Sequence, residues 1–100
     1  YRIVSTPVEV DGCKHVHTYY VIRTPIRERI QEKLSASGIP TIVHYPTPLH
    51  LQPAFSDLGY SEGQFPIAEA ASGQILSLPL YAELADEEIE RICELINSLA

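Results

Sequence analysis

The sequence predicts an α+β fold, in which a small, mainly antiparallel sheet carries helices on one face. The predicted elements follow the order strand, helix, strand, polar ribbon, helix, strand, helix. Only the first strand-like run is long and continuous enough for a buried central strand, which argues against a doubly wound parallel sheet. The 100 residues fit a single domain, spanning positions 1–100, with a modest core.

The first strand signals lie in the N-terminal quarter of the chain. Residues 3–10 favour β structure but contain Pro7, so we expect an edge strand or an extended arm there. Asp11-Gly12 is a turn signal. The β-branched and aromatic run at residues 16–22 predicts the central strand.

A helix is predicted directly after this strand. Thr24-Pro25 combines a capping hydroxyl with a proline at the first helical position. Ser37-Gly38 predicts the end of the helix, because glycine readily adopts the left-handed conformation required there. Its apolar residues recur every four positions: Ile26, Ile30 and Leu34.

The second half of the chain repeats these signals. Residues 39–43 form a short second strand, and residues 76–80 alternate as a third, with Pro79 marking its edge or end. Pro66 opens a helix, whose small-residue face is expected to pack closely against the sheet. That face consists of Ile67, Ala70, Ala71 and Ile75.

The last helix is expected to be capped by Asp86 and to have acidic residues in its first turn, where the helix dipole favours them. Its spacing predicts an inner stripe in which Cys93 belongs to the core. The stripe consists of Ile89, Ile92, Cys93, Ile96 and Leu99.

The stretch at residues 44–53, called the ribbon below, gathers polar side chains without helical or strand periodicity. Its three prolines favour a stiff, extended conformation that loses little entropy on binding. At three residues per turn, His44, Thr47 and His50 would share one edge, with Tyr45 on another. Such a strip suits a ligand rich in hydroxyl or phosphate groups. The alternative is a proline-rich connector that only covers a core edge.

Composition excludes several classes of function. A net charge of −6 argues against a nucleic-acid or anionic-membrane partner. No apolar run is long enough to cross a bilayer, and the signal-peptide layout is absent from the sequence. Cys13 and Cys93 are expected to be free thiols of a cytoplasmic protein. Because the chain contains no Met, we expect it to be a fragment of a longer protein.

The residues offer no self-contained active site, so we predict no catalytic, cofactor-binding or metal-ligating residue in this chain. Cys13, His15 and His17 would share a face of a strand, but no fourth ligand lies nearby. The sequence contains neither a G-x-S-x-G elbow nor a glycine-rich phosphate loop.

Six ordered motifs resemble the C-terminal part of the DegT/StrS-type sugar-nucleotide aminotransferases. The resemblance spans nearly the whole chain and is tightest over residues 38–81. The form His-Tyr-Pro-x-Pro-x-His-x-Gln is similar to members that aminate a 3-keto sugar nucleotide. The motifs are Tyr20-Val-Ile-Arg23, Gly38-Ile-Pro-Thr-Ile-Val-His-Tyr-Pro46, Pro48-Leu-His-Leu-Gln-Pro53, Leu58-Gly-Tyr60, Phe65-Pro-Ile-Ala-Glu69 and Leu76-Ser-Leu-Pro-Leu-Tyr81.

This resemblance implies a homodimeric parent of the aspartate-aminotransferase (type I) fold that uses pyridoxal phosphate (PLP). The chain would be its small C-terminal domain, and the Schiff-base lysine would lie in a missing N-terminal large domain. Lys14 and Lys33 do not match that lysine's motif, so this chain alone is expected to be inactive. His44 and Tyr45 would line the sugar-nucleotide site, with His50 in support. Glutamate would be the amino donor, and the product would serve surface-polysaccharide or secondary-metabolite biosynthesis.

Two segments depart from the family pattern. His17-Thr18 stands where an aromatic residue followed by His is usual, and Tyr81-Ala-Glu-Leu-Ala85 lacks the usual proline and threonine. A non-catalytic ligand-binding or regulatory α+β module is the alternative function, and it would use the ribbon as its recognition edge.

Overall fold

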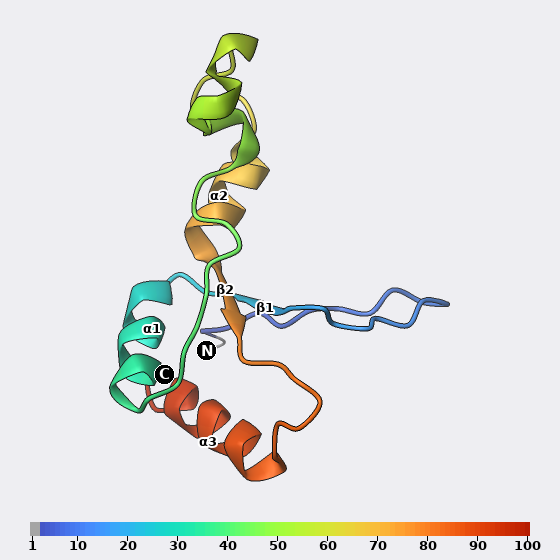
Figure 1. Cartoon of the computed structure of the whole chain (residues 1–100), viewed down its shortest axis with the longest axis vertical. Coiled ribbons are helices and arrows are strands. Elements are labelled where there is room, and N and C mark those ends of the chain that lie inside the picture. The colour runs from blue at the N-terminus through green and yellow to red at the C-terminus, as the bar shows by residue number, and fades with distance from the viewer. Residues whose placement is uncertain (1–2) are drawn as a thin grey trace.

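The sheet is small and antiparallel, as predicted. The computed structural model describes residues 3–100 and contains two regular strands, β1 (Tyr20–Arg23) and β2 (Ile75–Leu78), at its centre (Figure 1). They pair antiparallel from Tyr20 opposite Leu78 to Arg23 opposite Ile75. Isolated antiparallel bridges extend the sheet on either side, Ser5 with Arg23 and Ile42 with Ser77.

The strands are shorter than the sequence predicts. The central strand begins at Tyr20 instead of residue 16, because His17 has a φ of 48° and interrupts the extended backbone. The strand predicted at residues 39–43 is reduced to the single bridge at Ile42, since Pro40 has no N–H to donate to a ladder. Residues 76–80 form a strand only as far as Leu78.

Helices α1 (Arg27–Ala36) and α3 (Asp86–Asn97) cover one face of this sheet. Ile22 of β1 lies opposite Leu76 of β2, so both side chains point to the same face. Together with apolar residues of α1 and α3 they form the buried core, which confirms the predicted α+β class. The buried core residues are Ile22, Ile30, Leu34, Leu76, Ile92 and Ile96.

The predicted start of α1 is wrong by two residues. The helix begins at Arg27, with Ile26 at the cap position and no side-chain cap, so Pro25 is not the first helical residue. The buried Thr24 instead accepts a 3.2 Å hydrogen bond at Oγ1 from the Ile26 N–H, just before the helix. At the other end the N–H groups of Gly38 and Ile39 donate to the carbonyls of Ser35 and Leu34, respectively. This Schellman motif uses a φ of 76° at Gly38 and confirms the predicted glycine stop.

The start and the stripe of α3 differ from the prediction. Asp86 is the first helical residue and not its cap. The cap position is Ala85, which has no side-chain oxygen, and the Glu88 carboxylate accepts a 3.0 Å hydrogen bond from its N–H instead. Cys93 is exposed, because only the positions of Ile92 and Ile96 face the core directly.

Helix α2 (Pro66–Gln74) begins at Pro66 as predicted but does not pack on the sheet. Its chain continues directly into β2, so the helix projects beyond the end of that strand (Figure 1). Ile67 is 82% exposed and Ala70 is exposed as well, which contradicts the expected close packing. The radius of gyration is 15.6 Å, above the roughly 13 Å of a compact 100-residue domain.

Residues 6–19 form the second projecting part, an extended arm that folds back on itself (Figure 1). Gly12, with a φ of 80°, turns the arm, and the Cys13 N–H donates to the Val10 carbonyl across the turn. The sequence allowed an edge strand or an arm here, and the structure has the arm. No helix within residues 3–100 has the length and apolar character needed to cross a membrane.

Candidate functional site

His44 is held beside strand β2 by the bridge between Ile42 and Ser77. The Ile42 N–H donates to the Ser77 carbonyl at 3.2 Å, and the Ser77 N–H donates to the Ile42 carbonyl at 2.8 Å. Two residues further along, the His44 Nδ1 lies 2.8 Å from the Ser77 Oγ. Ser77 is buried and His44 is half-buried, so this contact is partly shielded from solvent. A polar side chain of β2 therefore anchors the first residue of the ribbon.

Two tyrosine rings pack against His44 and complete what we call the His44 cluster: Tyr19, His44, Tyr45 and Ser77. The Tyr19 ring stacks on the imidazole at a centroid distance of 4.2 Å, and the Tyr45 ring meets it edge-on at 5.5 Å. The Tyr45 side chain is 65% exposed. Within residues 3–100, His44 Nε2 has no hydrogen-bond partner and is not buried. The cluster therefore presents an imidazole nitrogen and a phenol to solvent.

The ribbon is not one continuous extended segment. Pro48 and Gln52 have the predicted extended geometry, but 3₁₀ helices form at Leu49–Leu51 and Pro53–Leu58. In the first of these, the Leu51 N–H donates to the Pro48 carbonyl at 3.0 Å, and the Gln52 N–H donates to the Leu49 carbonyl at 3.2 Å. The predicted common edge of His44, Thr47 and His50 is therefore wrong.

His50 lies apart from His44, in contact with helix α2. Its side chain is 8% exposed, and its Nε2 lies 3.4 Å from the Glu69 Oε2. The Phe65 ring packs edge-on against the imidazole at 4.8 Å. His50 thus connects the ribbon to α2 and does not present its ring to solvent.

Glu69 ties the loop before α2 to the helix itself. Its carboxylate accepts hydrogen bonds from the Gly63 N–H at 2.7 Å and the Phe65 N–H at 3.0 Å. The Gly63 hydrogen bond is the largest cause that lowers the pKa of Glu69, and the Phe65 N–H and His50 add to it. Burial opposes this shift in the pKa without reversing it.

The Glu69 contacts predict a specific pH dependence of stability. Because the pKa in the folded state lies below its ordinary value of 4.5, the carboxylate contributes stability above that pH. This contribution is lost as the pH falls through the lowered folded-state pKa. We expect Glu69→Gln to lower the thermal unfolding midpoint at pH 6, with a difference from the native protein that shrinks below pH 4.5. Glu62→Gln, at an exposed position of the same loop, is the control. If the unfolding midpoints of Glu69→Gln and the native protein differ by the same amount from pH 3 to 6, the assignment is wrong.

A largely apolar groove of about 640 Å³ runs between the ribbon and α2. Tyr45 belongs both to this groove and to the His44 cluster, so the two features adjoin. Such a surface can bury an apolar or aromatic group beside the polar atoms of the cluster. The groove is lined by Tyr45, Thr47, Pro48, Leu49, His50, Gln52, Phe55, Leu58, Tyr60, Phe65, Ala68, Ala71, Ser72 and Ile75.

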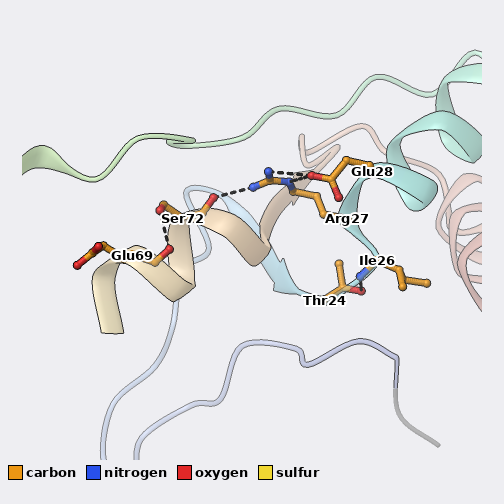
Figure 2. A network of polar contacts seen from close by, with 6 residues as sticks. All are labelled: Thr24, Ile26, Arg27, Glu28, Glu69 and Ser72. Atoms are coloured by element: carbon orange, nitrogen blue, oxygen red, sulfur yellow. Dashed lines mark hydrogen bonds and ion pairs between the residues drawn. The ribbon is translucent and has the colours of Figure 1, made fainter. Parts of the chain in front are cut away.

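Polar contacts at the C-terminal end of α2 hold this wall of the groove on the body of the domain (Figure 2). The guanidinium of Arg27 donates to the Ser72 carbonyl at 2.6 Å and forms an ion pair with Glu28 at 3.0 Å. The Ser72 hydroxyl in turn donates to the Glu69 carbonyl. The network therefore runs from α1 into α2, close to the carboxylate that contacts His50.

The two lysines do not fit the anchoring of PLP by this chain. Lys14 is exposed in the arm and Lys33 is exposed on α1. Among the described residues, neither lysine lines the groove or contacts the His44 cluster.

Three contributors to the site were not identified from the sequence. Ser77 and Tyr19 were assigned only to strands, because nothing local indicates that they meet His44. Glu69 belongs to one of the six motifs, but no role follows for it from that motif. Its place four residues after Phe65, in the first turn of a helix opened by proline, was an available signal for capping.

The fold is shared with solved sugar aminotransferases. DesV of S. venezuelae superposes with a TM-score of 0.92 at 32% identity, over 98% of this chain and 26% of that one. A putative sugar aminotransferase from Streptococcus pneumoniae, solved in its PLP form, gives a TM-score of 0.85 at 27% identity, over 97% of this chain and 26% of that one. The chain therefore has the fold of about a quarter of each of these two proteins.

Residues 2–97 match the DegT/DnrJ/EryC1/StrS aminotransferase family, and the chain belongs to that family. A "pleiotropic regulatory protein" of Geobacillus stearothermophilus is 51% identical over 98% of this chain and 27% of its own length. The dTDP-3-amino-3,6-dideoxy-alpha-D-galactopyranose transaminase of Aneurinibacillus thermoaerophilus is 35% identical over 94% of this chain and 25% of its own length. The chain thus spans about a quarter of the length of these relatives.

Proposed function

We propose that the whole protein is a PLP-dependent aminotransferase that converts a 3-keto sugar nucleotide to an amino sugar nucleotide with glutamate as donor. Residues 1–100 form its small C-terminal domain, and an N-terminal large domain supplies the Schiff-base lysine. The name of the Aneurinibacillus relative, a 3-amino sugar transaminase, supports the position of the amino group. The enzyme acts as a cytoplasmic homodimer in surface-polysaccharide or secondary-metabolite sugar biosynthesis, and this chain alone is inactive.

Within this enzyme, His44 and Tyr45 contact the sugar nucleotide. The observation that supports this assignment is the His44 ring, which is held by Ser77 and stacked on Tyr19 while its Nε2 has no hydrogen-bond partner among residues 3–100 and the exposed Tyr45 ring packs against it. A ring that is already ordered can bind a hydroxyl or phosphate oxygen with little further entropic cost. His50 supports the ribbon through Glu69 and does not need to reach the ligand.

Substitutions in the full-length enzyme test this assignment. We expect His44→Ala and Tyr45→Phe each to raise KM for the keto sugar nucleotide about fivefold to tenfold, as for the loss of one hydrogen bond. A charged phosphate partner would give a larger effect. The absorbance of the bound cofactor should not change, and the glutamate half-reaction should be affected less, because glutamate carries no nucleotide.

Tyr81→Phe is a matched control. Tyr81 is 51% exposed, and its hydroxyl lies 3.5 Å from the Glu88 carboxylate, outside the His44 cluster. It should leave KM unchanged. If His44→Ala and Tyr45→Phe also bind the sugar nucleotide normally, the ribbon is a structural connector.

A regulatory, non-catalytic role is the second candidate function, and the name of the Geobacillus relative favours it. Borohydride reduction of the full-length protein with PLP distinguishes the two. A stoichiometric covalent adduct on a lysine outside residues 1–100 supports the enzyme. Ligand binding without such an adduct supports the regulatory module.

A further inference from the structure

Ser77 has a contact that the proposed function does not by itself require. Its side chain is buried on β2, and its Oγ lies 2.8 Å from the His44 Nδ1. Ser77 and His44 are 33 positions apart in the sequence and meet because the backbones of Ile42 and Ser77 pair. The pairing fixes the Cα of Ser77, so its hydroxyl has a defined position relative to the imidazole.

The direction of this hydrogen bond follows from the surroundings of the hydroxyl. A serine hydroxyl can donate one hydrogen bond, whereas a neutral imidazole has one donor and one acceptor nitrogen. Among the described residues, His44 Nδ1 is the only partner of Ser77 Oγ. If Nδ1 carried the proton, the buried hydroxyl hydrogen would have no acceptor, which is unfavourable. The hydroxyl therefore donates to Nδ1, and the imidazole proton lies on Nε2.

We propose that Ser77 is a positioning residue that holds His44 in the Nε2–H tautomer, so that Nε2 donates a hydrogen bond to an acceptor oxygen of the sugar nucleotide. This inference rests on the proposed function. Tyr19 fixes the plane of the imidazole by stacking, and Ser77 fixes its rotation within that plane. The partner of Nε2 is then a diphosphate or sugar oxygen that accepts, and not a group that can only donate.

A pair of variants of nearly the same shape isolates the hydroxyl. Ser77→Thr keeps the donor, while Ser77→Val replaces it with a methyl group, and both β-branched residues suit a strand. In the full-length enzyme we expect Ser77→Val to weaken binding of the sugar nucleotide about tenfold relative to Ser77→Thr. The increase in KM should exceed the decrease in kcat. Binding of uridine diphosphate and thymidine diphosphate, measured separately, distinguishes a diphosphate oxygen from a sugar oxygen as the partner.

Selective ¹⁵N labelling of histidine gives a readout that does not depend on activity. The His44 Nδ1 resonance should have the position of a hydrogen-bonded acceptor in the native protein and in Ser77→Thr. It should move towards the unbonded position in Ser77→Val. An unchanged Nδ1 resonance in Ser77→Val, or equal binding by the Thr and Val variants, would overturn the proposal.

The same measurements separate this inference from the proposed function. If His44→Ala weakens binding but Ser77→Val does not, the positioning role fails and the proposed function stands. If His44→Ala binds the sugar nucleotide normally, the proposed function of His44 fails together with the ligand part of this inference. The Nδ1 resonance then still decides whether Ser77 sets the tautomer.

Discussion

Leu76→Ala is expected to lower the free energy of unfolding by about 2–5 kcal/mol, the range for leucine truncation in a close-packed core. Leu76 is completely buried and lies opposite Ile22 in the sheet register. Its side chain contacts the core shared by α1 and α3, so truncation leaves a cavity where four elements meet. The other buried core residues among residues 3–100 are held on separate elements, so they cannot move far enough to fill this cavity.

Chemical denaturation of the native protein and two variants tests this expectation. Leu80→Ala is the matched control, because Leu80 follows β2 closely but is 44% exposed. Leu80→Ala removes the same atoms as Leu76→Ala. It should lower the free energy of unfolding by less than half as much, since part of the Leu80 side chain is already in contact with water. If the two variants lose the same free energy of unfolding, Leu76 is not the central core residue that its burial indicates.

Features determined by local chemistry were predictable from the sequence. The glycine stop at Gly38 and the proline start at Pro66 depend only on backbone preferences, and both occur where predicted. The antiparallel sheet was also predicted, because only one strand-like run is long and continuous enough to belong to a buried parallel sheet. The predicted cap of α3 was wrong by one residue, because Ala85 occupies the cap position and the Glu88 carboxylate accepts a hydrogen bond from its N–H.

Features that depend on pairing between distant segments were not predictable. The apolar face of α2 was expected to pack on the sheet, but Ile67 is exposed because α2 continues directly into β2 without folding back over it. His44 and Tyr45 were singled out as site residues from the ribbon itself. Their neighbour Ser77 was missed, because its contact with His44 depends on the bridge to Ile42.

The attachment of α2 to the body depends on the carbonyl groups at its C-terminal end, which have no partner within the helix. Arg27 of α1 donates to the Ser72 carbonyl, and the Thr24 N–H donates to the Gln74 carbonyl at 3.0 Å. The Arg23 guanidinium also contacts the Gln74 side chain at 2.8 Å. Since α2 does not pack on the sheet, these polar contacts take the place of an apolar interface at this end.

Arg27→Met is therefore expected to destabilise the domain by about 1.5–3 kcal/mol, the range for a hydrogen bond to a charged group. The Arg27 side chain is only 14% exposed, and the variant leaves the Ser72 carbonyl without its donor. Arg27→Lys retains the charge but not the planar guanidinium, so it should recover only part of the loss. Arg29→Met removes the same charge from an exposed position of α1 and should change stability by less than about 0.5 kcal/mol. Chemical denaturation measures how much stability Arg27→Met loses. Hydrogen exchange should show that the amides of α2 are the ones that lose protection. If Arg27→Met costs no more than Arg29→Met, or if the α2 amides remain equally protected, contacts other than Arg27 hold α2 in place.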